Sequence, residues 1–162
     1  MELLRIYLQD HFAASCGALE LAKRAAGSNR GTEFEQPLAQ LRDDLAEDRE
    51  ALRDAMARLG VGADRLKEGA SWSAEKLGRL KLNGRWRGYS PLSRVVELEG
   101  LAMLICAERR LWDVLGAHVD AARLHGLDVA ALAARADDQL ARLRELHGHA
   151  AALAFARAPA AA

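Results

Sequence analysis

The stretch LKEGASWSAEKLGRLKLNGRWRGYSP, residues 66–91, decides the fold, because long helical patterns stand on both sides of it. It contains the turn residues Asn83-Gly84 and Gly88, and we expect one short helix in it, from Ser71 or Ser73 to about Leu80. The link spans about residues 60–90, long enough to carry the chain back along a helix of about 40 Å. The sequence therefore predicts two helical hairpins joined by one long crossover.

Four segments outside this crossover repeat apolar residues every three or four positions, which is the period of an amphipathic helix. We expect helices over about residues 2–26, 33–59, 91–119 and 129–153. Gly27 and Gly60 are expected to end the first two helices, and Thr32, Ser90 and Asp128 are expected to cap the N-termini of the others. Because the turns within each hairpin are short, each helix pair should be antiparallel.

Length and composition suit a single all-α domain over residues 1–156, followed by an Ala/Pro tail at 157–162 that we expect to be disordered. Hydrophobic residues make up 51% of the chain and aromatic residues only 5%, a mixture typical of amphipathic helices. Cys16 and Cys106 are interpreted as reduced core thiols. No signal peptide or membrane-spanning segment is expected, so a cytoplasmic location is predicted.

Polar residues interrupt the apolar faces of these helices. Asp48 takes a leucine position in the second pattern, Glu97 and Glu108 lie on the buried face of the third, and Gln139 interrupts the fourth. In an antiparallel hairpin, residues equally far from the turn lie at the same height along the bundle. Counting from the two short turns in this way places several of these polar residues near one height. The predicted polar core residues are His11, Asp48, Glu97, Glu108, Gln139 and Arg142.

Two interpretations of this polar layer compete. A hydrogen-bonded or ion-paired network that fixes helix register is favoured, because buried charges need partners. The alternative is an altered metal or redox site in which His11, Asp48 and Glu108 hold iron or manganese. A neighbouring arginine would oppose a bound cation, so no cofactor is predicted.

The segments AAGSNRGTEF (25–34) and GRLKLNGRWRGYSPLSR (78–94), with the expected helix order, carry a resemblance to a known family. The chain resembles the ferritin-like four-helix-bundle superfamily, and within it a bacterial branch. The resemblance implies a ferritin-like fold with one long crossover. Di-iron members of that superfamily use Glu-x-x-His motifs, which this sequence lacks, so their metal chemistry does not carry over.

Cations in the crossover form a possible anion-binding set. The cations could contact phosphate groups, and the ring of Trp86 could stack on a base. The cations of this set are Lys76, Arg79, Lys81, Arg85 and Arg87. The favoured interpretation is structural, with the cations paired to the acidic face of the second helix at Asp43, Asp44, Glu47 and Glu50. Because net charge is zero, nucleic-acid binding is not favoured.

These observations favour a non-catalytic helical bundle that acts as a scaffold or interaction protein and associates with itself, as a homodimer for example. A metal-binding protein or oxidoreductase with an altered site is the first alternative. Anion or nucleic-acid binding through the crossover is the second.

Overall fold

The computed structural model describes residues 2–62 and 89–156. Four long helices occupy most of this part of the chain, and no strand occurs within it. The elements are α1 (Glu2–Ser28), α2 (Glu35–Arg58), α4 (Pro91–His118), the 3-10 helix η3 (Ala121–Leu124) and α5 (Val129–Phe155). The predicted all-α bundle is confirmed. The expected short helix at 71–80 and the tail at 157–162 lie outside the described residues.

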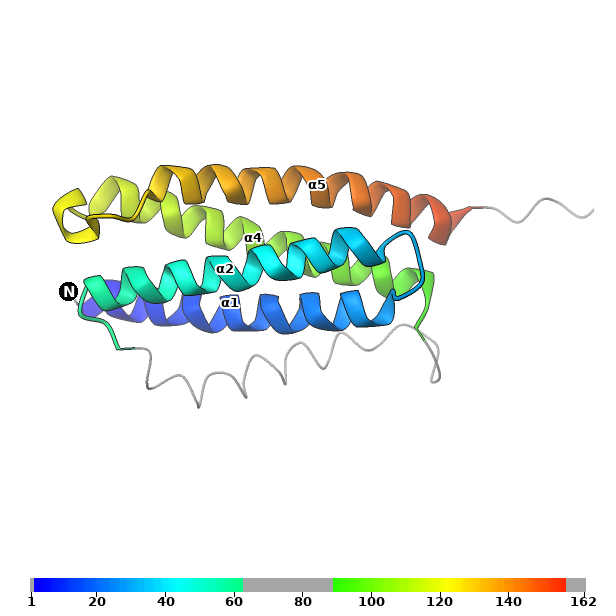
Figure 1. Ribbon diagram of the computed structural model, residues 1–162, viewed down its shortest axis with the longest axis horizontal. Helices are drawn as coiled ribbons and strands as arrows, with labels where there is room; N and C mark the ends of the chain where they lie inside the picture. Colours follow the sequence, from blue (N-terminus) through cyan, green and yellow to red (C-terminus); the bar gives the residue numbers. More distant parts are fainter. Residues whose placement is uncertain (1, 63–88, 157–162) are drawn as a thin grey trace, which may run out of the picture.

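The helices form two hairpins that lie side by side (Figure 1). α1 packs antiparallel to α2, α4 packs antiparallel to α5, and α1 joins the hairpins by packing on α4. α2 and α4 run in the same direction. Gly100 lets α1 and α4 approach closely, since a Cβ there would lie 3.2 Å from Leu21 Cδ2. The contact between α2 and α5 is much sparser, and it is this side of the bundle that holds the polar layer.

The buried apolar residues divide into two clusters along the bundle axis. One includes Leu45 of α2 and Ile105 of α4, and the other includes Leu52 of α2 and Leu111 of α4. On each helix a buried acid lies between the two clusters, at Asp48 and at Glu108. Buried acidic side chains therefore separate the two apolar clusters at one level of the bundle.

Capping hydrogen bonds and a glycine with positive φ mark the ends of the helices. Ser90 Oγ accepts a hydrogen bond from the Ser93 amide at 3.1 Å, and Asp128 accepts one from the Ala131 amide at 2.9 Å. Both predicted caps are confirmed. Gly60 ends α2 with φ of 71°, and the Val61 amide returns to the Met56 carbonyl at 2.8 Å. That six-to-one bond with a left-handed glycine is a Schellman motif.

The turn between α1 and α2 differs from the expectation. α1 continues through Gly27 to Ser28, and the residue with positive φ is Gly31, at 74°. Thr32 does not cap a helix at residue 33. Its Oγ1 accepts a bond from the Phe34 amide, α2 begins at Glu35, and the Glu35 carboxylate accepts one from the Gly31 amide at 2.7 Å. These bonds close the turn two residues later than predicted.

Candidate functional site

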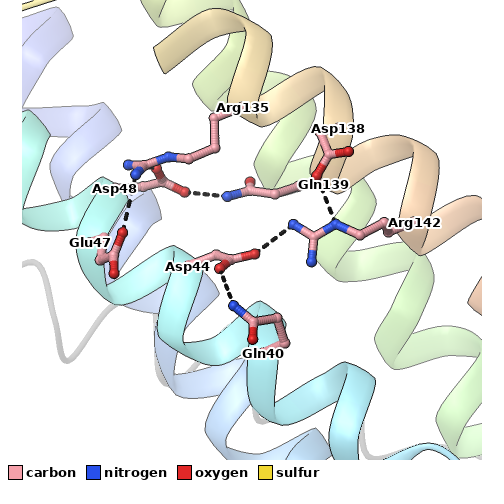
Figure 2. A network of polar contacts seen from close by, with 8 residues as sticks. All are labelled: Gln40, Asp44, Glu47, Asp48, Arg135, Asp138, Gln139 and Arg142. Atoms are coloured by element: carbon pink, nitrogen blue, oxygen red, sulfur yellow. Dashed lines mark hydrogen bonds and ion pairs between the residues drawn. The ribbon is translucent and has the colours of Figure 1, made fainter. Parts of the chain in front are cut away.

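The candidate site is the polar layer where α2 faces α5 (Figure 2). Asp48 is only 3% exposed, and both of its carboxylate oxygens are engaged by α5. Gln139 Nε2 donates to Oδ2 at 2.6 Å, and the Arg135 guanidinium pairs with Oδ1. Arg135 also reaches the exposed carboxylate of Glu47 at 3.2 Å. Asp48 therefore joins two helices that pack only sparsely against each other.

About one helical turn further along, a second set of charged side chains also connects α2 with α5. Arg142 of α5 pairs with Asp44 of α2 at 2.5 Å and with Asp138 of its own helix at 2.8 Å. Gln40 donates to the other oxygen of Asp44 at 2.8 Å. The α2–α5 side is thus joined by two successive sets of interhelical bonds. The inner ladder is centred on the buried side chains of Asp48 and Gln139, and the outer ladder joins the partly exposed Arg142 to Asp44.

α4 contributes Glu108, which is 6% exposed. The pKa of Glu108 is raised from 4.5 to about 8, mainly by burial and also by the nearby negative charge of Asp48, while Arg135 opposes the shift. Glu108 is therefore predominantly protonated at neutral pH. Burial likewise raises the pKa of Asp48, while Gln139 and Arg135 lower it. Desolvation makes a second anion costly here, so the layer holds one carboxylate stabilised by a guanidinium and one neutral acid.

The structure brings together three of the predicted polar residues, Asp48, Glu108 and Gln139. Arg142 belongs to the outer ladder and does not contact Asp48. Glu97 lies elsewhere, paired with Arg24 at 2.9 Å.

His11 is the other predicted member of the layer. It packs edge-on against Tyr7, with ring centroids 4.4 Å apart. Burial lowers the pKa of His11, and the charge of Asp10 opposes that shift. Phe12, the next residue, lies beneath Arg53, five residues beyond Asp48. The ring contact of His11 is thus with its own helix, and the placement of His11 level with Asp48 stays a prediction.

Arg135 is the functional partner that sequence reasoning missed. It lies one turn before Gln139 on α5, a position from which a long side chain can reach the same level of the bundle. The signal was present, since Arg135, Gln139 and Arg142 recur at four and three residues. The sequence predicted Arg142 in the polar layer, whereas Arg135 is the arginine that pairs with Asp48.

A second polar cluster joins the two loops that carry the family resemblance. The Asn29 side chain is fully buried, and its Nδ2 donates to the Ala25 carbonyl and to Tyr89 Oη, both at 2.8 Å. Arg94 donates to Asn29 Oδ1 at 2.5 Å and stacks 4.0 Å from the Phe34 ring centroid. This cluster fixes the turn between α1 and α2 against the start of α4.

The side chains of the polar layer are not suited to bind iron or manganese, the metals considered for the alternative metal site. Both oxygens of Asp48 already bind α5, and a guanidinium in direct contact opposes a cation. Across residues 2–62 and 89–156, no group of three or more histidine, cysteine or acidic side chains could hold a metal ion.

The acidic face of α2 has partners within the described residues. Asp43 pairs with Arg42, Glu50 pairs with Arg49 and Arg53, and Asp44 and Glu47 pair with α5. The cations and the tryptophan proposed to bind anions lie in the part of the chain that the structure does not describe.

An apolar groove runs along the outer side of the second hairpin. It has a volume of about 690 Å³ between α4 and α5 and is lined by Leu98, Ala102, Met103, Cys106, Leu140 and Leu143, with Glu99, Arg144 and His147 at its rim. Cys106 is exposed there, so its interpretation as a core thiol is wrong; Cys16 is half-buried beside the core. Sequence periodicity missed the groove because α4 is apolar on more than one face.

Comparison with protein-family models, curated proteins and solved structures gives no match. Among the described helices, none is both long enough and apolar enough to cross a membrane.

Proposed function

We propose that the chain is a non-catalytic helical bundle that works as a scaffold by associating with its own copies. The observation that carries the proposal is the apolar groove between α4 and α5. Met103 is 67% exposed beside it, although the residue is large and apolar. A contiguous apolar surface with a polar rim is typical of a protein–protein contact site.

The polar layer supports this function indirectly. Asp48 binds Gln139 and Arg135, and Asp44 binds Arg142, so each ladder ties one hairpin to the other at a fixed register. A wrong register would leave a buried carboxylate without its guanidinium, at a cost of about 3 kcal/mol. The layer then keeps the α4–α5 surface rigid for binding.

Two finer assignments belong to the same proposal. Membership of the ferritin-like superfamily is supported by two antiparallel hairpins whose inner helices, α2 and α4, run in the same direction. A cytoplasmic location is supported by Cys16 and Cys106 being free thiols.

Sedimentation equilibrium of the purified full chain tests the proposal. A monomer has a mass of 17.6 kDa, so a dimer has twice that, about 35 kDa. We expect the dimer at micromolar concentrations, and a monomer at every accessible concentration would refute self-association.

The two alternatives are separated by their own measurements. Stoichiometric iron or manganese in protein purified from supplemented medium would favour a metal protein. Salt-sensitive retention on heparin would favour anion binding. We expect neither result.

A further inference from the structure

The outward-facing surface of α4 carries a stripe of residues with helical spacing. They are separated by three, four or seven positions, and we call them the α4 outer stripe: Leu92, Glu99, Met103, Cys106, Arg110 and Ala117. All six are exposed, Leu92 to 38% and Met103 to 67%. The stripe borders the α4–α5 groove through Glu99, Met103 and Cys106. This spacing places the six side chains on one face of α4, where a second helix could pack against them.

The two charges of the stripe have opposite signs and lie on either side of its apolar centre. Glu99 precedes Met103 by four residues, and Arg110 follows Cys106 by four. Among the described residues, Glu99 pairs with His147 at the groove rim, at 3.1 Å. The Arg110 side chain is 75% exposed and contacts Asp113 at 3.5 Å. Both charges are therefore available to a partner at modest cost.

We propose that the α4 outer stripe is the surface through which two copies of this chain associate, with their α4 helices antiparallel across a two-fold axis. The proposal rests on the proposed function of self-association and specifies its geometry. With the axis between Leu104 and Ile105, Met103 of each copy faces Cys106 of the other. In the same register Glu99 faces Arg110 and Leu92 faces Ala117.

Charge complementarity selects this orientation. A two-fold axis makes the contact reciprocal, so each antiparallel dimer contains the Glu99–Arg110 pair twice. A parallel two-fold arrangement would instead place Glu99 against Glu99 and Arg110 against Arg110. Like charges facing each other across an interface disfavour that arrangement. The stripe is thus self-complementary in one direction only.

The fourth pair in this register brings Val96 opposite Asp113. Asp113 is bound by Arg109 of its own helix, and this pairing lowers the pKa of Asp113, so its charge is already compensated within one chain. The central pair is apolar and adaptable, because the unbranched thioether of Met103 can fill the groove beside Cys106.

A charge exchange across the stripe tests both the surface and the direction. Glu99→Arg alone places arginine against Arg110, and Arg110→Glu alone places glutamate against Glu99. We expect each single variant to weaken the dimer by about tenfold or more, measured as the dissociation constant from sedimentation equilibrium. The double variant Glu99→Arg/Arg110→Glu restores the opposite pairs, and we expect its dissociation constant to return to within about threefold of the wild-type value.

Glu20→Arg is the matched control. Glu20 is exposed on α1 and pairs with Lys23 three residues away, so the substitution makes the same change in net charge away from the stripe. We expect it to leave the dissociation constant unchanged. Circular dichroism of each variant establishes that the bundle remains folded.

The outcomes separate the two claims. A monomeric wild-type protein would overturn the proposed function together with this interface. A wild-type dimer that both single variants leave intact would retain self-association and overturn the α4 surface. Single variants that weaken the dimer without rescue by the double variant would overturn the antiparallel register.

Discussion

Replacing Glu108 by glutamine should stabilise the protein at neutral pH. The pKa of Glu108 is about 8 in the folded chain, against an ordinary value of 4.5. The folded state therefore keeps a proton that the unfolded state releases, and stability falls as pH rises between these two values. Over about 3.5 pH units, at 1.36 kcal/mol per unit, the loss reaches about 5 kcal/mol by pH 8 and about 3 kcal/mol by pH 7.

Glutamine has nearly the shape of a protonated glutamate and cannot ionise. The advantage of Glu108→Gln in free energy of unfolding should therefore grow from near zero at pH 4.5 to several kcal/mol at pH 8. Asp48 leaves a residual slope of the same sign, because burial raises its pKa as well.

Urea unfolding followed by circular dichroism, at closely spaced pH values from 4.5 to 8, measures this difference. Glu145→Gln, on the exposed side of α5, is the matched control and should show no such growth. A Glu108→Gln variant whose unfolding free energy tracks the wild-type protein at every pH would refute a neutral, buried Glu108.

Further substitutions test the rest of the account, each measured by urea unfolding at pH 7. Arg135→Met removes the guanidinium from buried Asp48 and should cost about 3 kcal/mol, whereas Arg142→Met in the outer ladder should cost about 1 kcal/mol; equal losses would contradict the ranking of the ladders. Asn29→Ala removes the hydrogen-bond partner of Tyr89 and Arg94 and should lower the free energy of unfolding by about 2 kcal/mol. Gly60→Ala strains a backbone with φ of 71° and should cost about 1 kcal/mol, and no loss would argue against the Schellman turn.

Sequence periodicity predicted the helices because each apolar face is nearly uninterrupted. The same regularity exposed Asp48, Glu108 and Gln139, since each takes a position where an apolar residue is expected. Ser90-Pro91 likewise predicted the start of α4 through ordinary cap chemistry.

Register along the bundle axis was harder to predict, because it depends on how many residues each turn consumes. α1 continues to Ser28 and α2 begins only at Glu35, so the turn between them differs from the predicted one. Glu97 lies on the inward face of α4 as predicted, but it pairs with Arg24 and is not part of the layer around Asp48. The sequence could not show which arginine binds Asp48, because Arg135 and Arg142 lie on the same side of α5. The position of α2 along the bundle axis decides that Arg135 binds Asp48 and Arg142 binds Asp44.

The distance between two copies of residue 117 tests the antiparallel interface most directly. In Ala117→Cys, with Cys16→Ser and Cys106→Ser, spin labels can be placed at that position alone. Because residues 106 and 117 lie in the proposed interface, sedimentation equilibrium first establishes that the labelled variant dimerises like the wild-type protein, and pulsed electron spin resonance then measures the separation of the labels. Residue 117 of one copy lies opposite residue 92 of the other, so the axial offset is 25 residues, about 38 Å at 1.5 Å per residue. In the antiparallel dimer the two labels should lie about 40 Å apart. A distance near 10–15 Å would indicate parallel helices, at the usual spacing of 8–10 Å plus the label arms, and would contradict the antiparallel interface.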